Sequence, residues 1–198
     1  MNVSLILGHP RPDSFNHAIA ETARATLRAH RHAVAFHDLY GERFDPLMGA
    51  AESLTRLSDD PLVERHCAEI ARAEGIIVVH PNWWGGPPAI VKGWIDRVIR
   101  PGVAYDMVPG DGGEPAPVGR LRTATALVIT TANTPPERER DLFGDMLEVL
   151  WRRCIWGLSG VPRIERIAFS VVAASTPEMR TTWLEQVRAA VARHFPIG

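Results

Sequence analysis

Several features that would assign a protein to a class at once are scarce or missing in this chain of 198 residues. The formal net charge is −1, so there is no basic surplus of the kind that binds nucleic acid or an anionic membrane. The two cysteines, Cys67 and Cys154, have neither a CxxC pairing nor metal-ligand spacing, and we expect buried free thiols in a reducing compartment. No apolar run approaches about eighteen residues, and no signal-peptide pattern opens the sequence. These absences predict a cytoplasmic protein with no nucleic-acid partner and no membrane insertion.

Motifs for several other chemistries are missing as well. The chain has no GxGxxG fingerprint, no Walker loop and no Gly-x-Ser-x-Gly nucleophile elbow. His30, His32 and His37 have no acidic or cysteine partner at ligand spacing, so we expect a solvated surface cluster and predict no metal site. Asp96 and Arg97 are interpreted as solvent-facing helix charges of little structural weight.

The chain does contain short apolar runs that alternate with patterns of helical spacing. A hydrophobic content of 45% is enough for a full core, and no linker or repeat divides the sequence, which predicts a single domain over residues 1–198. The runs typical of buried strands are residues 3–7, 34–36, 76–79, 124–129 and 167–172. Strands that alternate with helices in this way predict an α/β fold, a doubly wound five-stranded parallel sheet with helices on both faces.

Three further segments carry expectations of their own. Residues 101–120 are rich in Gly and Pro, and we expect a long excursion rather than a regular element. After the fourth strand we expect a helix with Phe143, Met146, Leu147, Leu150 and Cys154 on one side. The last helix is expected to begin near Thr176 and Pro177, with Met179, Trp183, Val187 and Val191 facing inward.

Three loops follow strands at the carboxyl edge of the predicted sheet, where open α/β sheets bind ligands. In the first loop, Asp13 or Ser14 can cap the next helix, and polar side chains beside free helix N–H groups suit a phosphate. In the second, Trp83 and Trp84 lie in a stretch rich in Gly and Pro that cannot bury both rings by itself. At least one ring needs a flat partner, which is either a planar cofactor or a neighbouring helix.

The motifs of these loops occur together with others along the chain: Gly8-His9-Pro10, Ser14-Phe15-Asn16, Pro81-Asn82-Trp83-Trp84, the segment 88–98, Ala104-Tyr105, Thr130-Thr131 and Gly144-Asp145-Met146. In this combination the chain resembles the flavodoxin-like NAD(P)H:quinone oxidoreductases, a family that includes DT-diaphorase and bacterial members. The resemblance extends from residue 3 to about residue 190. Its most specific part is the tryptophan loop with the helix that follows it.

The resemblance implies a flavin at the carboxyl edge of the sheet. Because little of the sequence follows the last helix to hold an adenosine, we expect FMN, with FAD as the alternative. The resemblance also implies NAD(P)H as the electron donor and a two-electron ping-pong reduction of quinones or related flat electrophiles at one shared site. A homodimer is implied too, in which the partner subunit completes the site. The residues implied to bind the cofactor are His9, Ser14, Phe15, Asn16, Pro81, Asn82, Trp83, Trp84, Thr130, Thr131, Ala132 and Asn133. Those expected to face the substrate are Tyr105, Met107 and Gly85, although Tyr105 could equally cap the sheet edge.

Several positions depart from the family pattern. Glu137 and Phe143 stand where the family has a Tyr and a His that stabilise charge on the reduced flavin, so no residue is assigned as catalytic. Gly85 replaces an aromatic residue, which we expect to widen the pocket, and Ala132-Asn133 replaces a Gly-Gly pair. The acceptor could therefore be another electrophile, such as a nitroaromatic compound. The alternatives are a regulatory or electron-carrying flavoprotein with little quinone turnover and, more remotely, a phosphate-ligand module without flavin.

Overall fold

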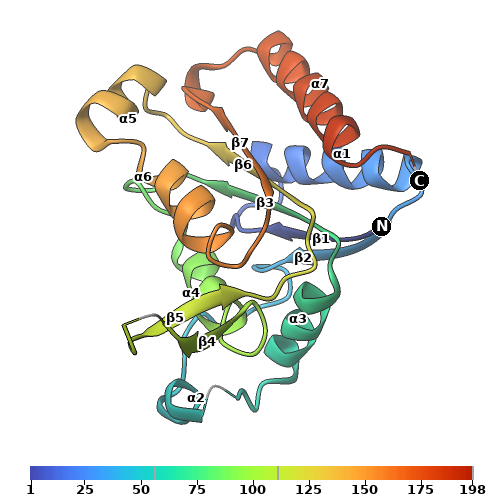
Figure 1. The fold of residues 1–198 in the computed structure, drawn as a ribbon. Helices are drawn as coiled ribbons and strands as arrows, with labels where there is room; N and C mark the ends of the chain where they lie inside the picture. The colour runs from blue at the N-terminus through green and yellow to red at the C-terminus, as the bar shows by residue number, and fades with distance from the viewer. Residues whose placement is uncertain (56, 111, 198) are drawn as a thin grey trace.

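A five-stranded parallel sheet in the order β2-β1-β3-β6-β7 forms the centre of the computed structural model, which describes residues 1–55, 57–110 and 112–197 (Figure 1). Its strands are β1 (Asn2–Leu7), β2 (Ala33–Asp38), β3 (Gly75–Pro81), β6 (Thr125–Thr131) and β7 (Arg163–Phe169). The chain adds β2 on one side of β1 and then crosses to add β3 on the other side. The strand order therefore switches between β1 and β3, which is where doubly wound sheets bind ligands. The predicted fold class is confirmed.

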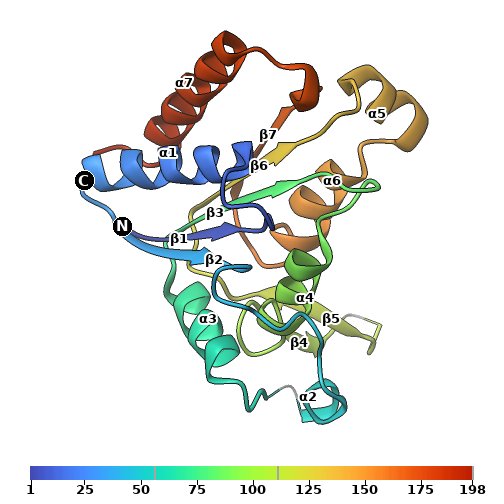
Figure 2. The same cartoon turned by 180° about the vertical axis from the view of Figure 1, so that it is seen from behind.

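Helices cover both faces of this sheet. They are α1 (Phe15–Ala29), α2 (Ala50–Thr55), α3 (Pro61–Arg72), α4 (Ala89–Val98), α5 (Pro136–Phe143), α6 (Met146–Glu148) and α7 (Pro177–His194), with a π-helical segment η1 (Val149–Ile155) and a 3₁₀ turn η2 (Val172–Ala174). One face carries α1 and α7, and the other carries α3, α4 and η1 (Figure 2). Within the described residues, the helices lack the combination of length and apolar content that a membrane crossing requires.

Strands β3 and β6 show why apolar runs in the sequence could be recognised as strands. Every residue of β3 and of β6 is buried, because each strand packs against helices on both faces. Three helices begin at residues whose side chains accept main-chain hydrogen bonds: Ser14 caps α1, Asp60 caps α3 and Thr176 caps α7. On α7, Val187 and Val191 face inward as predicted, whereas Met179 is exposed.

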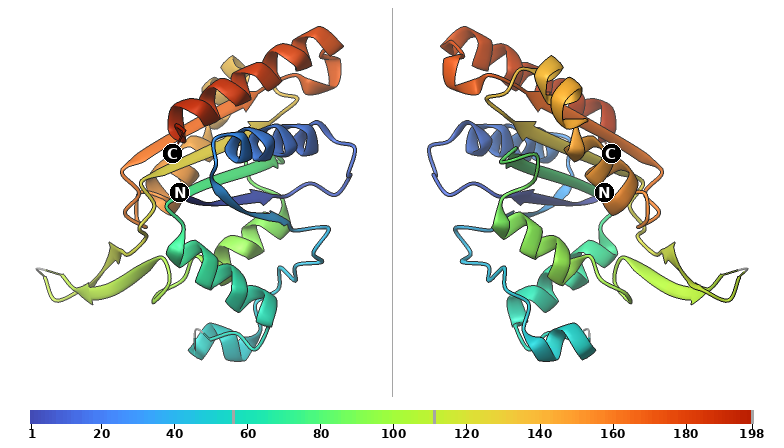
Figure 3. Two further views of the ribbon diagram at one scale, coloured as in Figure 1. Left: turned by 90° about the vertical axis from the view of Figure 1, so that its right-hand side faces the viewer. Right: turned by 90° about the vertical axis from the view of Figure 1, so that its left-hand side faces the viewer.

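The segment expected to be an excursion without regular structure contains a β-hairpin, so that prediction is wrong. Strand β4 (Tyr105–Pro109) pairs with the antiparallel strand β5 (Pro115–Gly119), and the hairpin projects away from the sheet (Figure 3). Prolines that argue against a strand are tolerated here because both strands of a two-stranded hairpin are edge strands.

The single helix expected after β6 is broken. Helix α5 ends at Gly144, whose φ is 74°, and Asp145 is also left-handed with a φ of 47°. Phe143 and Met146, on either side of this break, are exposed. The π-helical turns of η1 then shift the helical period, and Cys154 is exposed as well. The prediction of a buried thiol is therefore confirmed for Cys67 and wrong for Cys154.

Three groups expected at the surface are buried. His32 and His37 are almost inaccessible, and they lie apart, because His32 bonds to the Phe195 carbonyl whereas His37 lies beside Glu42. Arg97 is 5% exposed and bonds to the carboxylate of Glu52. The partners of His32 and Arg97 come from segments distant in sequence, which spacing along the chain could not show, whereas Glu42 lies only five residues after His37.

Candidate functional site

A cavity of about 630 Å³ opens at the carboxyl ends of β1, β3, β6 and β7. Its volume is in the range of sites for small molecules and cofactors. Most of the residues implied to bind a cofactor line it: His9, Ser14, Phe15, Asn16, Pro81, Asn82, Trp83, Thr131, Ala132 and Asn133. Trp84 and Thr130 do not line it. Loops widely separated in sequence thus meet in one place.

The first loop places a helix N-terminus in the cavity. Ser14 is buried, and its Oγ accepts a hydrogen bond of 3.3 Å from the main-chain N–H of His17. A helix of 15 residues begins there, and its first N–H groups and dipole favour a bound anion. This corner suits a phosphate group.

Thr131 joins the three loops. The Nδ2 of buried Asn16 donates to the Thr131 hydroxyl at 2.9 Å, and the main-chain N–H of Asn82 donates to the Thr131 carbonyl at 2.7 Å. The lining is therefore organised before any molecule binds. Asn82 keeps one buried atom, Oδ1, that has no hydrogen-bond partner among the described residues. A donor on a bound molecule would satisfy that acceptor.

His9 and Trp83 form one wall of the cavity, with ring centroids 6.2 Å apart. The main-chain N–H of Arg11 donates to His9 Nδ1 at 3.1 Å, which places the ring proton on Nε2. Burial lowers the pKa of His9 and outweighs the opposing effect of the Arg11 carbonyl oxygen, which lies near Nδ1 and favours the protonated ring. His9 is thus a neutral hydrogen-bond donor near pH 7, and the positive charge in the lining comes from Arg11 and Arg180.

The tryptophan loop turns back on itself at Trp84 and Gly85. Trp83 and Gly86 exchange main-chain hydrogen bonds of 2.9 and 3.1 Å, and the residues between them have φ values of 56° and 73°. Two left-handed residues in this position form a type I′ turn. The Trp84 side chain is fully exposed, so the loop presents one ring to the cavity and the other to solvent.

Gly85 does not widen the cavity, contrary to expectation. A Cβ atom at residue 85 would lie 2.0 Å from Cε of Met146, so the methionine side chain already occupies that space. Tyr105 and Met107 lie elsewhere, in an apolar cavity of about 270 Å³ between the hairpin and η1 that also contains Ile99 and Leu158. Within one chain the structure does not bring these three residues to the large cavity.

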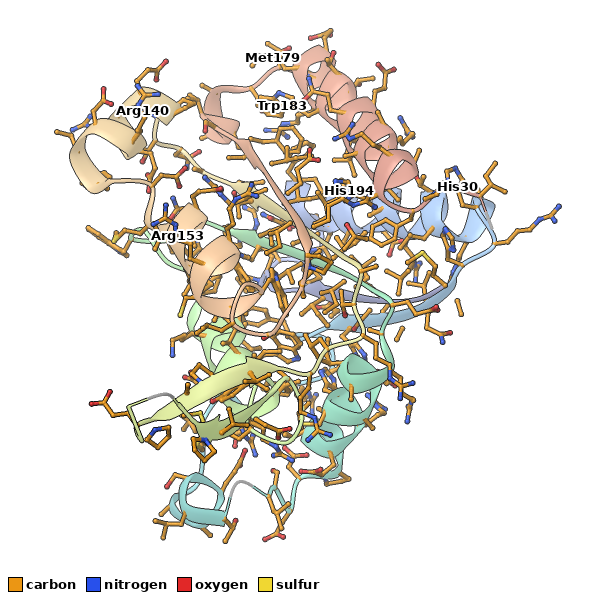
Figure 4. All side chains as sticks on the ribbon, viewed as in Figure 1. His30, Arg140, Arg153, Met179, Trp183 and His194 are labelled. Carbon is orange, nitrogen blue, oxygen red and sulfur yellow. The ribbon has the colours of Figure 1, made fainter. Side chains whose placement is uncertain are left out.

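The residues that the sequence analysis missed follow β7. Val172, Ala173 and Arg180 line the cavity, and the Ala173 main chain donates to Asn133 Oδ1 at 2.9 Å. The loop after β7 could have been placed at the site from the sequence, since a fifth parallel strand must end at the same edge as the others. Trp183, which reaches from α7 toward the sheet, stacks on Phe169 at the end of β7 with ring centroids 5.3 Å apart (Figure 4).

A second cluster of polar side chains has the spacing of a metal site. Ligand atoms of His37, Glu42 and His66 lie within 4.8 Å of one another. Trp94 Nε1, however, donates to His66 Nδ1 at 2.9 Å, which leaves the ring proton on Nε2, the nitrogen that faces Glu42 at 3.2 Å. Burial opposes ionisation of Glu42, but the hydrogen bonds from the two histidines prevail and lower its pKa to about 2. The cluster fits a hydrogen-bonded ion network better than a metal centre, because that proton blocks the ligand atom.

Comparisons with known proteins agree with this architecture. A family model described as a flavodoxin-like fold matches residues 1–195. A Haemophilus influenzae protein named as an uncharacterized NAD(P)H oxidoreductase is 36% identical over 175 residues, which cover 86% of this chain and 83% of that protein. The NAD(P)H dehydrogenase (quinone) 1 of Cavia porcellus is 31% identical over 168 residues, or 74% of this chain. The matched region spans only 59% of the length of the Cavia enzyme.

Solved structures share the fold over almost the whole chain. Smu.1420 from Streptococcus mutans UA159 superposes with a TM-score of 0.85 at 28% identity, covering 98% of this chain and all (100%) of the other. An FMN-dependent NADH-azoreductase from Bacillus anthracis, solved in complex with FMN, superposes with a TM-score of 0.72 at 14% identity, covering 98% and 100% of the two chains. At that identity the second likeness is one of fold alone.

Proposed function

The chain belongs to the family of proteins with a flavodoxin-like fold, and from this membership we propose that it is a flavin-dependent NAD(P)H oxidoreductase. The proposed reaction is the two-electron reduction of quinones or related flat electrophiles by a ping-pong mechanism. The names of the Haemophilus and Cavia relatives support the donor, and the Cavia name supports the acceptor class.

The observation that carries the proposal is the large cavity itself. It combines the N-terminus of α1 for an anion, the Trp83 ring for a flat molecule and polar groups of residues 131–133 for a hydrogen-bonding edge. The unpartnered Oδ1 of Asn82 adds an acceptor that awaits a donor. When bound, a flavin supplies the hydride chemistry, and the protein supplies position and electrostatics.

The chain's own residues have separate tasks in this proposal. Ser14 and α1 would hold the phosphate, Pro81 and Trp83 would flank the ring system, and Thr131 would fix the loops around it. We propose FMN as the flavin because the α1 terminus suits one phosphate group, and FMN carries one whereas FAD carries two. FAD is the alternative.

We further propose a homodimer. Tyr105 and Met107 lie outside the large cavity of their own chain, so they would face substrate only across a subunit interface. The unpaired thiols of Cys67 and Cys154 suit a reducing compartment and support a cytoplasmic location.

A second candidate function is an electron carrier or redox-responsive regulator with little quinone turnover. Glu137 and Phe143, at the positions where the family has its charge-stabilising Tyr and His, lie exposed on α5 and do not line the cavity. This placement favours a flavoprotein that binds its cofactor but transfers hydride slowly.

The test is a visible spectrum of the purified chain incubated with FMN and with FAD, followed by anaerobic NADPH or NADH and then a quinone. The proposal expects a bound flavin band that bleaches within seconds and returns when quinone is added. A bound flavin that stays oxidised would favour the carrier, and failure to bind any flavin would reject both. Trp83→Ala should weaken flavin binding, whereas Leu54→Ala, on an exposed part of α2 away from the cavity, should not.

A further inference from the structure

Three side chains form a continuous hydrogen-bonded chain behind the anion corner of the cavity. Ser14 Oγ lies 2.9 Å from Nδ1 of His17, and His17 Nε2 lies 3.3 Å from Oδ2 of Asp38. Ser14 is in the cavity lining, His17 is in the first turn of α1, and Asp38 ends β2. The other carboxylate oxygen of Asp38 accepts the Tyr40 main-chain N–H at 3.2 Å, which fixes its orientation.

The Ser14–His17–Asp38 chain has two protonation states, with His17 neutral or protonated, and they differ in where the hydroxyl proton of Ser14 points. With His17 neutral, Nε2–H donates to Asp38, so Nδ1 can only accept, and the Ser14 hydroxyl must donate to it. With His17 protonated, Nδ1–H donates to Ser14 Oγ, which also accepts the His17 main-chain N–H. The single hydroxyl proton of Ser14 is then free to point into the cavity. Proton uptake at His17 therefore creates a new donor for an anion.

The charges around His17 determine whether a bound anion favours the neutral or the protonated form of its ring. Asp38 on β2 stabilises the protonated ring from behind. From the loop after β1, the neutral His9 ring faces it with centroids 6.3 Å apart. Arg11 and Asp13 on the same loop form an exposed pair at 3.7 Å and largely offset each other. An anion bound in the cavity next to Ser14 adds a second negative charge near His17 and so stabilises the imidazolium.

We propose that His17 is a positioning residue that couples binding of the phosphate group to proton uptake, by turning the Ser14 hydroxyl into the cavity. This inference rests on the proposed function, in which that phosphate belongs to the flavin. Affinity for a phosphorylated ligand rises as His17 becomes protonated, and affinity for the same ligand without phosphate does not.

A Ser, a His and an Asp also make up the catalytic group of many hydrolases. Here Ser14 is the cap of α1 and only 4% exposed, and its Oγ already accepts a helix N–H. The geometry suits a hydroxyl that donates to an anion rather than one that attacks a substrate.

The test is calorimetric titration of the full chain with FMN and with riboflavin, from pH 5.5 to 8.5, in two buffers of different ionisation enthalpy. The comparison variant is His17→Gln, which keeps a hydrogen-bonding side chain but cannot titrate. The wild type should take up more protons with FMN than the variant does, by up to one per site. Between pH 6 and pH 8 its FMN affinity should fall by up to about tenfold more than that of the variant, because binding is linked to proton uptake in the wild type alone. The titration of the FMN phosphate itself is common to both proteins and cancels.

Riboflavin should show no difference between the wild type and His17→Gln. Asp38→Asn removes the charge behind the imidazole and should move the FMN profile to lower pH. His30→Gln, a matched change at the other end of α1, should leave the profile unchanged. Equal proton uptake and equal pH slopes in the wild type and His17→Gln would overturn the coupling.

Inorganic phosphate as a second probe separates this inference from the proposed function. If the chain binds no flavin but takes up a His17-dependent proton with phosphate, the coupling holds and the oxidoreductase proposal fails. If FMN binds and is reduced by NAD(P)H without that proton, the oxidoreductase proposal holds and the coupling fails.

Discussion

At the scale of single residues, His80 shows how the protein holds a buried polar group in one form. The ring lies at the end of β3, where Nδ1 donates to the Pro81 carbonyl at 2.8 Å and Nε2 accepts from Trp151 Nε1 at 3.0 Å. Both bonds require the neutral ring with its proton on Nδ1. Burial lowers the pKa of His80 to about 4, against the opposing effect of the bond to Pro81.

This histidine predicts a loss of stability in acid. The unfolded chain takes up a proton on His80 below its ordinary pKa of 6.5, while the folded protein does not do so until about pH 4. The free energy of unfolding should therefore fall as pH drops between these values, by about 3 kcal/mol from this group. Urea unfolding at intervals from pH 7.5 to 4.5 measures it. His80→Gln should show a shallower decline, whereas His30→Gln should keep the wild-type slope, and a shared slope would contradict the assignment.

Trp84 carries backbone strain in the type I′ turn, because a left-handed φ of 56° is unfavourable for a bulky residue. Trp84→Asn creates the Asn-Gly pair that this turn prefers, and should raise the free energy of unfolding of the unliganded protein by about 1 kcal/mol. The strain is kept although the Trp84 ring is fully exposed, which indicates that the ring has a role in function. The same change should therefore weaken turnover with quinone. Thermal unfolding and steady-state kinetics measure the two effects. Leu54→Asn, at another exposed apolar position, should not stabilise the protein.

At the scale of elements, Arg97 ties α4 to the segment that includes α2. Its guanidinium bonds to Glu52 at 2.8 Å in buried surroundings, and to the Asp45 carbonyl at 2.7 Å and Ser58 at 3.1 Å in partly buried ones. Arg97→Met leaves the Glu52 carboxylate buried without its partner and should cost about 3–5 kcal/mol in urea unfolding. Lys92→Met, which breaks an exposed pair with Asp96 on the same helix, should cost under about 1 kcal/mol. Similar losses in both variants would refute the buried ion pair as the stronger link.

The elements that could be predicted from sequence are those whose signal is local. Strands β3 and β6 each contain a continuous apolar run, and the Ser14 and Thr176 caps precede their helices directly. The hairpin was missed because its prolines argue against strands, and the break after Phe143 was missed because a left-handed Asp145 has no strong sequence mark. Arg97 was misplaced because its partners lie far along the chain.

The candidate site was predictable to the same degree. The loops after β1, β3 and β6 could be located because parallel strands end at one edge, and the family resemblance supplied the residues on them. The position of the Met146 side chain beside Gly85 could not be predicted, since it depends on how the turn after α5 meets the tryptophan loop. The roles assigned to Tyr105, Met107 and Gly85 stay predictions.

At the scale of the whole molecule, the hairpin is a part of the fold whose apolar side chains one chain by itself does not cover. It projects from the sheet (Figure 3), and its two faces carry exposed apolar side chains: Met107 on one, Val108 and Val118 on the other. A two-stranded hairpin is at best marginally stable in water by itself, so apolar residues on both faces favour a covering partner. In the proposed homodimer, that partner is the second subunit.

Val118→Glu tests this arrangement because it places a charge on the face of the hairpin opposite Tyr105 and Met107. The wild type should sediment as a dimer, and the variant as a monomer, since burying an unpaired carboxylate is costly. The monomer should still bind flavin, because its large cavity is built within one chain, but its quinone turnover should fall at least about tenfold as substrate positioning across the interface is lost. Leu54→Glu, at another exposed apolar position but on α2, should remain dimeric and active. A monomeric Val118→Glu that keeps full turnover would place the entire substrate site in one chain and remove Tyr105 and Met107 from it.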